Sequence, residues 1–371
     1  MAYSLELKTV LSSTQHLRIY KIMSPTRAVL CGYYGMGNAG DEALLMSLLQ
    51  MLPESVEPIV LSGDPQATKK QYQVASYHRK STFTILKVLQ QSDAFIWGGG
   101  SLMQDATSMA SPVYYAGLMA LAQQRGLKTI AWAQGIGPLN KSFTRWLTKQ
   151  VLLGCDGISV RDTASAQLLT EWQIEPIVAP DPVWALQSDT APQLEATTKP
   201  KVAIVLRSHP LLTPDRLETL IKAFKDFQAK TNTFLLLIPF QPSTDSAIAT
   251  KIADQLDREY QIITVDNPQQ LKGLFKEVKM TVGMRLHSLI MAAASGCSCF
   301  ALSYDPKVSQ LMLELDLPGY ELATLPQDEQ VISDALCQHY QQGAFDRVQI
   351  QSISDRALIH QQLLSEILLN S

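Results

Sequence analysis

The sequence predicts an α/β protein built of two doubly wound, Rossmann-like domains that face each other across a cleft. Short apolar runs rich in Val, Ile, Leu and Phe alternate with longer amphipathic segments, a pattern typical of parallel strands joined by crossover helices. This alternation breaks at residues 187–200, where Ser, Thr, Pro and Gln replace the apolar periodicity and indicate a linker. Before the break, glycine and polar residues follow almost every apolar run.

The first domain is expected over residues 26–186, after an N-terminal extension at residues 1–25. Its strands are expected near residues 27–32, 57–62, 94–97, 129–134, 157–160 and 176–179. A second domain is expected over residues 201–371, with strands at 201–207, 233–240, 261–266, 280–283 and 299–304. Helical patterns such as "DEALLMSLLQML" and "TPDRLETLIKAFKDFQAK" lie between these runs.

Composition excludes several classes of protein. The chain has 371 residues and is 46% hydrophobic, which is enough apolar material for a two-domain core. A net charge of -3 without a block of like charge argues against a nucleic-acid partner or a polybasic anchor. The five cysteines are scattered, and no Cys or His pair has the spacing of metal ligands, so we expect reduced thiols and no bound metal.

Targeting signals are weak. The first residues lack a cationic segment followed by an apolar one, so we expect no signal peptide. The most apolar segment, "SLIMAAASGCSCFALSY", is interrupted by Gly296 well before the roughly 20 apolar residues that a membrane span needs. We therefore expect a cytoplasmic protein, and contact with the inner face of the plasma membrane stays open.

The stretch "GYYGMGNAGDEALL" follows the first expected strand and carries glycines at the spacing G-x-G-x-x-G: Gly35, Gly37 and Gly40. Such a loop can hold the pyrophosphate of a dinucleotide, and Asp64 after the second strand could bind its ribose. Against this, the carboxylates of Asp41 and Glu42 in the first helical turn interact favourably with the helix dipole but would repel a pyrophosphate. The loop is thus expected to cap its own helix or to contact hydroxyl groups.

The second half contains an anion-binding pattern. "VGMRLHSLIMAAASG" places Arg285 and His287 between a strand and an apolar helix, where free backbone N–H groups and the helix dipole attract anions. "LSYDPKVS" places Lys307 after the next strand, which is expected to pair beside the previous one. These three residues are expected to converge on one small, highly charged ligand.

Taken together, the motifs "GYYGMGNAGDEALL", "WGGGSLMQDATS", "AQGIGPL", "SVRD", "PDPVWAL", "GMRLHSLIMAAASG" and "SYDPKVS" resemble those of the polysaccharide pyruvyl transferases, in particular the bacterial CsaB type. The resemblance covers roughly residues 27–315. It implies a GT-B-like fold and no cofactor. It also implies transfer of the enolpyruvyl carbons of phosphoenolpyruvate onto two sugar hydroxyls as a ketal, with release of phosphate.

The resemblance also implies roles for individual residues. Phosphoenolpyruvate would be bound by Arg161, Arg285, Leu286 (through its backbone), His287 and Lys307, and catalysis would use Arg285, His287 and Lys307. The acceptor would be a cell-wall or capsule sugar, such as a lipid-linked aminosugar oligosaccharide, held by loops of the first domain. Candidate acceptor residues are Gly37, Asn38, Asp41, Glu42, Gly99, Gly100, Ser101 and Asp105. Asp41 and Asp105 are also candidates for the general base.

Other classes stay open at this point. A nucleotide-sugar glycosyltransferase would share the architecture and use Arg285 and Lys307 on a diphosphate. An NAD-dependent oxidoreductase would use the glycine-rich loop. A polysaccharide-binding module is a more distant alternative, because it would not need cations facing a glycine-rich cleft. Whether the chain forms a homo-oligomer is also left open.

Overall fold

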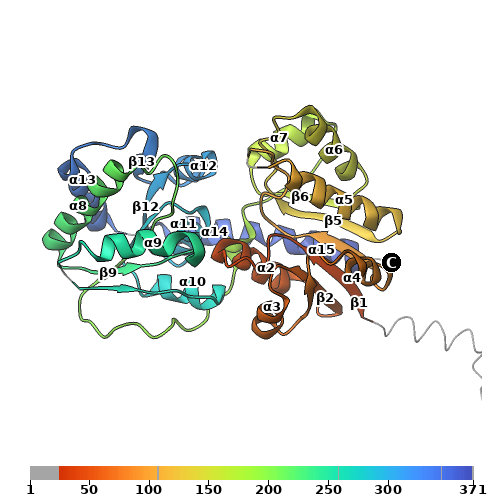
Figure 1. Cartoon of the computed structure of the whole chain (residues 1–371), viewed down its shortest axis with the longest axis horizontal. Helices are drawn as coiled ribbons and strands as arrows, with labels where there is room; N and C mark the ends of the chain where they lie inside the picture. The colour runs from red at the N-terminus through yellow and green to blue at the C-terminus, as the bar shows by residue number, and fades with distance from the viewer. Residues whose placement is uncertain (1–24, 107, 258, 344, 370–371) are drawn as a thin grey trace, which may run out of the picture.

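The computed structural model describes residues 25–369 except residues 107, 258 and 344. The chain forms two α/β lobes side by side, each built on one parallel sheet (Figure 1). The two-domain fold predicted from the sequence is therefore confirmed. The N-terminal extension expected at residues 1–25 lies outside the described residues, apart from residue 25.

The first sheet has seven parallel strands in the order β3-β2-β1-β4-β5-β6-β7. The strands are β1 (Thr26–Cys31), β2 (Val56–Ser62), β3 (Ala75–His78), β4 (Ala94–Trp97), β5 (Lys128–Gln134), β6 (Gly157–Val160) and β7 (Ile177–Val178). The strand order reverses between β1 and β4, which opens a crevice at the carboxyl ends of these strands. Only β3 was not expected, because this half-exposed edge strand lacks a run of apolar residues.

Helices cover both faces of the first sheet. They are α2 (Ala39–Met51), α3 (Pro65–Tyr72), α4 (Thr82–Gln90), α5 (Ala110–Gln124), α6 (Ser142–Leu153) and α7 (Thr163–Glu171). Apolar side chains of α4 to α7 share one core with one face of the sheet, whereas those of α2 share a separate core on the other face. The short helix η1 (Pro182–Ala185) follows β7 and leads to the linker.

The second sheet has six parallel strands in the order β10-β9-β8-β11-β12-β13. They are β8 (Lys201–Val205), β9 (Phe234–Leu237), β10 (Tyr260–Ile262), β11 (Met280–Gly283), β12 (Ser298–Ser303) and β13 (Gly319–Glu321). The helices are α8 (Pro214–Thr231), α9 (Pro242–Ala253), α10 (Pro268–Lys276), α11 (Leu286–Ala294), α12 (Pro306–Leu315), α13 (Glu329–Gln342) and the short η2 (Leu322–Thr324). The three-residue edge strand β13 was not expected from the sequence, because it is too short to show a period.

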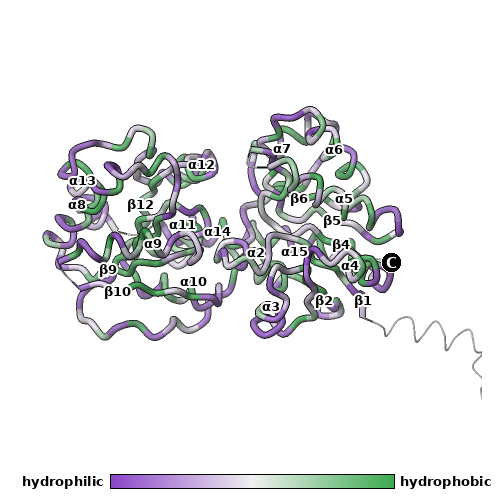
Figure 2. Tube along the Cα trace, viewed as in Figure 1, coloured by the Kyte–Doolittle hydropathy of each residue, from purple (hydrophilic) through white to green (hydrophobic). Residues whose placement is uncertain are grey.

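The last two helices, α14 (Arg347–Ala357) and α15 (Ile359–Leu369), run from the second lobe back to the first, as the blue ribbon in Figure 1 shows. Helix α15 packs on β5, β6 and α2, and its Leu363, Leu364 and Leu368 join the first domain's core. The expected assignment of all of residues 201–371 to the second domain is corrected accordingly. The apolar stripe of α15 covers the part of the sheet face that α2 leaves open. Figure 2 shows apolar segments in the interior of both lobes.

Helix α15 also carries a fully buried histidine. The imidazole Nε2 of His360 donates to the backbone carbonyl of Pro180 at 3.0 Å, so Nδ1 is the acceptor and takes a hydrogen bond from Ser159 Oγ at 2.9 Å. Ser159 Oγ in turn accepts from the backbone N–H of Ala133 at 2.8 Å. Burial lowers the pKa of His360 to about 4, because a charged ring here would lose its hydration.

This histidine should make stability fall in mild acid. Its pKa is depressed in the folded state, so its contribution is complete above the unfolded value near 6.5 and is lost as the pH falls towards 4. The loss should reach about 2 kcal/mol at pH 5. Denaturant unfolding at pH 7.5 and pH 5 should therefore show that wild type loses about 2 kcal/mol more than His360→Gln.

The exposed His78 offers a matched control, and His78→Gln should keep the pH dependence of wild type. Equal pH dependence of wild type and His360→Gln would contradict the assignment.

Candidate functional site

A cavity of about 480 Å³ lies where the carboxyl edges of the two sheets face each other. The first domain lines it with residues from the loops after β1, β4 and β6, among them Asn38, Gly40, Asp41, Gly100, Ser101 and Arg161. The second domain contributes residues that follow β8, β11 and β12, among them Arg207, Arg285, Leu286, His287, Tyr304 and Lys307. The volume falls within the range of small-molecule sites, and the lining is rich in cations.

Three charged side chains join the two domains at this cavity. Arg161 Nη1 lies 2.5 Å from Asp181 Oδ2, and His287 Nε2 of the second domain lies 3.3 Å from the same oxygen. Burial would raise the pKa of the Asp181 carboxyl, but the charges of Arg161 and His287 outweigh it and hold the pKa far below its usual range. The carboxylate is therefore a permanent anion shared by both domains.

The imidazole of His287 has a partner in either protonation state. When protonated, its Nε2–H can donate to Asp181; when that nitrogen is unprotonated, it can accept from Arg161 Nη1, which lies 3.2 Å away. The other ring nitrogen faces the first turn of α2, because a Cβ built on Gly40 would lie only 2.4 Å from His287 Nδ1. A ring placed between these groups can give up and regain a proton without moving.

Lys307 reaches the same cluster from the first turn of α12. Its Nζ donates to Ser101 Oγ at 2.5 Å, and Arg161 Nη2 donates to the same oxygen at 3.2 Å. Burial, together with the nearby charge of Arg161, lowers the pKa of Lys307. Ser101 thus links Lys307 to Arg161, which in turn contacts His287.

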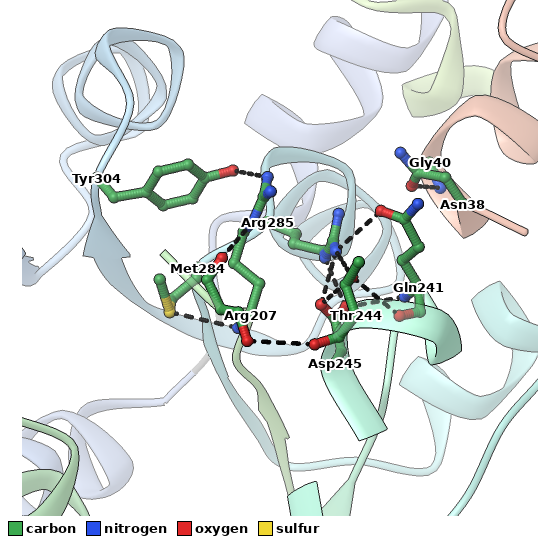
Figure 3. A network of polar contacts seen from close by, with 10 residues as sticks. Asn38, Gly40, Arg207, Gln241, Thr244, Asp245, Met284, Arg285 and Tyr304 are labelled. Atoms are coloured by element: carbon green, nitrogen blue, oxygen red, sulfur yellow. Dashed lines mark hydrogen bonds and ion pairs between the residues drawn. The ribbon is translucent and has the colours of Figure 1, made fainter. Parts of the chain in front are cut away.

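Arg285 is held in place by the carboxylate of Asp245, which no sequence motif singled out. Its Nε and Nη2 donate to the two oxygens of Asp245 at 2.8 and 2.7 Å, and Nη2 also lies 3.3 Å from Gln241 Oε1 (Figure 3). The Asp245 side chain is fully buried at the start of α9. Because no hydrogen bond within the described residues uses Nη1, this end of the guanidinium can meet a ligand in the cavity.

A third arginine of the cavity, Arg207, was not predicted from the sequence. It follows β8 and donates from Nη1 to Tyr304 Oη at 2.9 Å, with its guanidinium 5.1 Å from the centre of that ring (Figure 3). Its signal in the sequence was its place at the end of the run "KVAIVLR", at the carboxyl edge of the sheet. Asp181 had the same kind of signal in "APDP".

The glycine-rich loop closes on the protein itself. The backbone N–H of Ala39 donates to the carbonyl of Phe240 in the second domain at 2.9 Å, and that of Gly40 donates to Asn38 Oδ1 at 3.1 Å. His287 occupies the space beside Gly40, where a pyrophosphate would have to rest. The expectation that this loop caps its own helix agrees with these contacts.

Glu42 supports the loop from below. Its Oε1 accepts from the backbone N–H of Gly35 at 2.8 Å, and its Oε2 accepts from Tyr72 Oη at 2.7 Å. Gly35 has a φ of 67°, a left-handed conformation that glycine adopts without strain. Both carboxylate oxygens of Glu42 therefore accept hydrogen bonds within the first domain, and the residue does not line the cavity.

The candidate acceptor residues divide into two groups. Asn38, Asp41, Gly100 and Ser101 line the cavity, whereas Gly37, Glu42, Gly99 and Asp105 do not. Asp105 is held elsewhere by hydrogen bonds from the backbone N–H groups of Asn140 and Lys141, at 2.7 and 2.8 Å. Its carboxylate thus serves the turn that leads into α6.

Asp41 is one of the carboxylates that line the cavity. It lies in the first turn of α2, next to His287 across the domain boundary. Burial raises the pKa of Asp41 to about 6, although the nearby charge of His287 works against this rise. A carboxylate with this pKa can accept a proton near neutral pH.

Aromatic side chains form the outer wall on the first domain's side. Tyr33 and Tyr115 line the cavity, and the guanidinium of Arg79 lies 5.5 and 5.6 Å from their ring centres. Arg79 Nη2 also donates to Tyr115 Oη at 3.0 Å. Such contacts hold flat apolar rings in place, and Tyr33 remains 38% exposed.

Within the described residues, no three His, Cys, Asp or Glu side chains gather closely enough to hold a metal ion. The chemistry visible in the cavity is that of arginines, a lysine, an imidazole and carboxylates.

This architecture of two Rossmann-like domains and a shared cleft is found in GT-B enzymes. The UDP-GlcNAc 2-epimerase from Neisseria meningitidis, bound to UDP-GlcNAc, aligns with a TM-score of 0.61 and 11% identity over 93% of this chain and 100% of that chain. A glycosyltransferase from Rickettsia africae aligns with a TM-score of 0.55 and 13% identity over 94% and 100% of the two chains. Anabaena HepE in complex with UDP and glucose aligns with a TM-score of 0.55 and 11% identity over 92% and 95%. At these identities the likeness establishes the fold alone.

The family model of the polysaccharide pyruvyl transferases matches residues 38–306. The chain therefore belongs to the polysaccharide pyruvyl transferase family and is a transferase, as the sequence motifs predicted. The CsaB type stays a prediction. The sequence has no significant match among curated proteins. The family match favours pyruvyl transfer over the nucleotide-sugar and NAD alternatives.

Removing the carboxylate behind Arg285 should destabilise the second domain strongly. Asp245→Ala leaves a guanidinium that is 7% exposed without its counter-charge, which should lower the free energy of unfolding by about 3 to 5 kcal/mol. Urea unfolding at neutral pH measures the loss. Glu171→Ala breaks the exposed ion pair with Arg145 and should change stability little. An equal effect of both variants would contradict this account.

Proposed function

We propose that the donor substrate is phosphoenolpyruvate and that its pyruvyl group is transferred, as a ketal, to two hydroxyls of a sugar in a cell-wall or surface polysaccharide precursor. The observation that carries this proposal is the convergence of Arg161, Arg285, His287 and Lys307 on one cavity. Phosphoenolpyruvate has a carboxylate and a phosphate on a three-carbon frame, so binding it needs several cations close together. The family match agrees with this chemistry.

The carboxylates behind these cations favour a substrate anion in front of them. Asp181 and Asp245 orient the guanidiniums of Arg161 and Arg285, so few side-chain torsions must be fixed when a ligand binds. In this proposal Lys307 and Arg161 bind the phosphate beside Ser101, and Nη1 of Arg285 binds the carboxylate. The backbone of Leu286, at the start of α11, adds the positive end of a helix dipole.

His287 is proposed as the general acid. It delivers a proton to C3 of phosphoenolpyruvate. C2 then becomes electrophilic and resembles an oxocarbenium ion. The first sugar hydroxyl then bonds to C2 and loses its proton. The C2–O bond to phosphate breaks next, phosphate leaves with the bonding electrons, and the second hydroxyl adds to C2 with loss of its own proton. One proton ends on C3 and one on the leaving phosphate, so the two hydroxyl protons balance the reaction.

Asp41 is proposed as the base that takes a hydroxyl proton. It faces the same cavity as His287, and its raised pKa of about 6 suits this role. Asp105, the other carboxylate suggested by the sequence, is not proposed, because it lies outside the cavity lining and caps the turn before α6.

The acceptor sugar is proposed to lie against the first domain's wall of the cavity. Asn38 and the backbone at Gly100 offer hydrogen-bonding groups there. The ring of Tyr33, braced by Arg79, offers a flat apolar surface on which the C–H face of a sugar can rest. A lipid-linked aminosugar oligosaccharide is the acceptor class to test first.

The deciding measurement is acceptor-dependent release of phosphate from phosphoenolpyruvate, with the ketal product identified by mass spectrometry. Wild type should release phosphate only when the sugar acceptor is present. His287→Ala should lower kcat about 100-fold or more, since general acid–base groups contribute that much. Glu171→Ala, an exposed change far from the cavity, should keep wild-type turnover.

The general-acid assignment fails if His287→Ala keeps most of its turnover. Consumption of a nucleotide sugar in place of phosphoenolpyruvate would instead overturn the proposed donor.

Asp41 should control the acidic limb of the pH profile. A base must be deprotonated to act, so kcat/KM should fall as the pH drops through about 6, the pKa of Asp41. Asp41→Asn should lower kcat and abolish this limb while leaving the KM for phosphoenolpyruvate close to wild type. Steady-state kinetics between pH 5 and pH 8 test this expectation. An unchanged acidic limb in Asp41→Asn would remove Asp41 from the mechanism.

A further inference from the structure

The outer face of the first domain has an unusual distribution of charge. Helices α4, α5 and α6, with the residues that lead into and out of them, span residues 79–90, 109–126 and 140–154. These three segments contain seven Lys and Arg residues and no Asp or Glu, in a chain whose net charge is -3. We call the surface formed by these segments the α4–α6 face. Of its cations, Arg145 is partly neutralised by Glu171 of α7, at 2.7 Å.

Large apolar side chains are exposed on the same face. Phe83 is 81% exposed in the first turn of α4, and Val113 is 43% exposed in the first turn of α5. Phe143 and Trp146, 52% and 57% exposed, stack on each other at the start of α6, with ring centres 6.2 Å apart. Each of these helices begins toward the carboxyl edge of the parallel sheet, so these side chains lie at the same end of their helices.

A groove of about 390 Å³ separates α4 from α5 on this face. Its walls are mostly aliphatic, from Ile85 and Leu86 on α4 to Leu118 and Leu121 on α5. At one end it is lined by Arg79 and Lys80, whose charges precede α4. Apolar walls beside two cations fit the acyl chain and the anionic headgroup of a lipid.

The groove and the cavity are lined by adjacent residues of α5. Tyr114 lines the groove and Tyr115 lines the cavity. Arg79 lies between them, 5.2 Å and 5.6 Å from the two ring centres. Anything that settles on the α4–α6 face therefore lies beside the proposed acceptor wall.

We infer that the α4–α6 face docks on a bilayer that contains anionic lipids. Exposed aromatic and aliphatic side chains surrounded by Lys and Arg, without acidic residues, complement such a surface in both polarity and charge. No helix among the described residues is long and apolar enough to cross a membrane, so the contact is peripheral. Docking brings the cavity close to a lipid-linked acceptor. That interpretation rests on the proposed function, whereas docking itself can be measured without turnover.

Co-sedimentation of the full-length protein with vesicles tests the inference. Wild type should bind vesicles of equal parts phosphatidylcholine and phosphatidylglycerol, and binding should weaken as salt is raised from low to physiological ionic strength. Vesicles of phosphatidylcholine alone should bind it far less. Absence of binding to the anionic vesicles at low salt would overturn the inference and leave a protein partner as the occupant of this face.

Matched variants locate the surface. Phe83→Ser combined with Trp146→Ser should weaken vesicle binding about tenfold or more, since each buries apolar area at the bilayer. Leu313→Ser, at a site that is 80% exposed on α12 of the second domain, should bind like wild type. Lys80→Glu combined with Lys87→Glu should weaken binding and flatten its salt dependence, whereas Lys222→Glu on α8 should not. Equal losses in test and control variants would overturn the inference.

Phosphate release with a water-soluble acceptor separates the docking surface from the catalytic proposal. All of these variants should keep wild-type turnover in that assay, because none of the changed residues lines the cavity. Normal vesicle binding with no turnover in wild type would refute the proposed function alone. Normal turnover with no vesicle binding would refute the docking surface alone.

Discussion

The cleft depends on the contacts that the Asp181 carboxylate makes with both domains. It lies within 2.5 Å of Arg161 from the first domain and 3.3 Å of His287 from the second, and the side chains of Arg161 and Asp181 are only 6% exposed. Without it, an arginine and an imidazole 3.2 Å apart would repel each other whenever the imidazole is charged. One shared anion therefore neutralises the cations that meet at the domain boundary and positions the proposed acid.

The position of Asp181 depends in turn on the last helix. Asp181 Oδ1 accepts from the backbone N–H of Val183, which fixes the turn into η1. The preceding residue, Pro180, is held through its carbonyl by His360 of α15. Helix α15, whose His360 lies 180 residues after Pro180 in the sequence, thus supports the position of Asp181.

The sequence was sufficient for the fold because hydrophobic periodicity and parallel topology are local and additive. Runs such as "KVAIVLR" and "TFLLLIPF" predict buried strands, and the rule that ligands meet carboxyl edges predicts which loops gather. The same rule directed attention to the cations Arg161, Arg285, His287 and Lys307, which follow those strands and line one cavity, whereas their roles stay predictions.

The partners of these cations could not be predicted. Asp245 lies 40 residues from Arg285 and Asp181 lies 106 from His287, and nothing in their local sequence marks them as ion-pair partners. The docking of α15 on the first sheet was missed for the same reason, because an apolar helical stripe does not specify which face it covers. What periodicity and motifs leave open is long-range pairing, which only the assembled chain determines.

The glycine-rich loop shows how one local pattern serves different ends. In a dinucleotide site, the open N–H groups at the start of the helix and the small third glycine admit a phosphate. In this chain the second domain occupies this position. The carbonyl of Phe240 accepts a hydrogen bond from the N–H of Ala39, and His287 packs against Gly40, where a side chain would otherwise lie. In the proposed function the anion site therefore lies at Arg285, His287 and Lys307 and not at the first helix. The same proposal places an uncharged sugar against the first domain, where Tyr115 of α5 lines the cavity and the adjacent Tyr114 lines the groove.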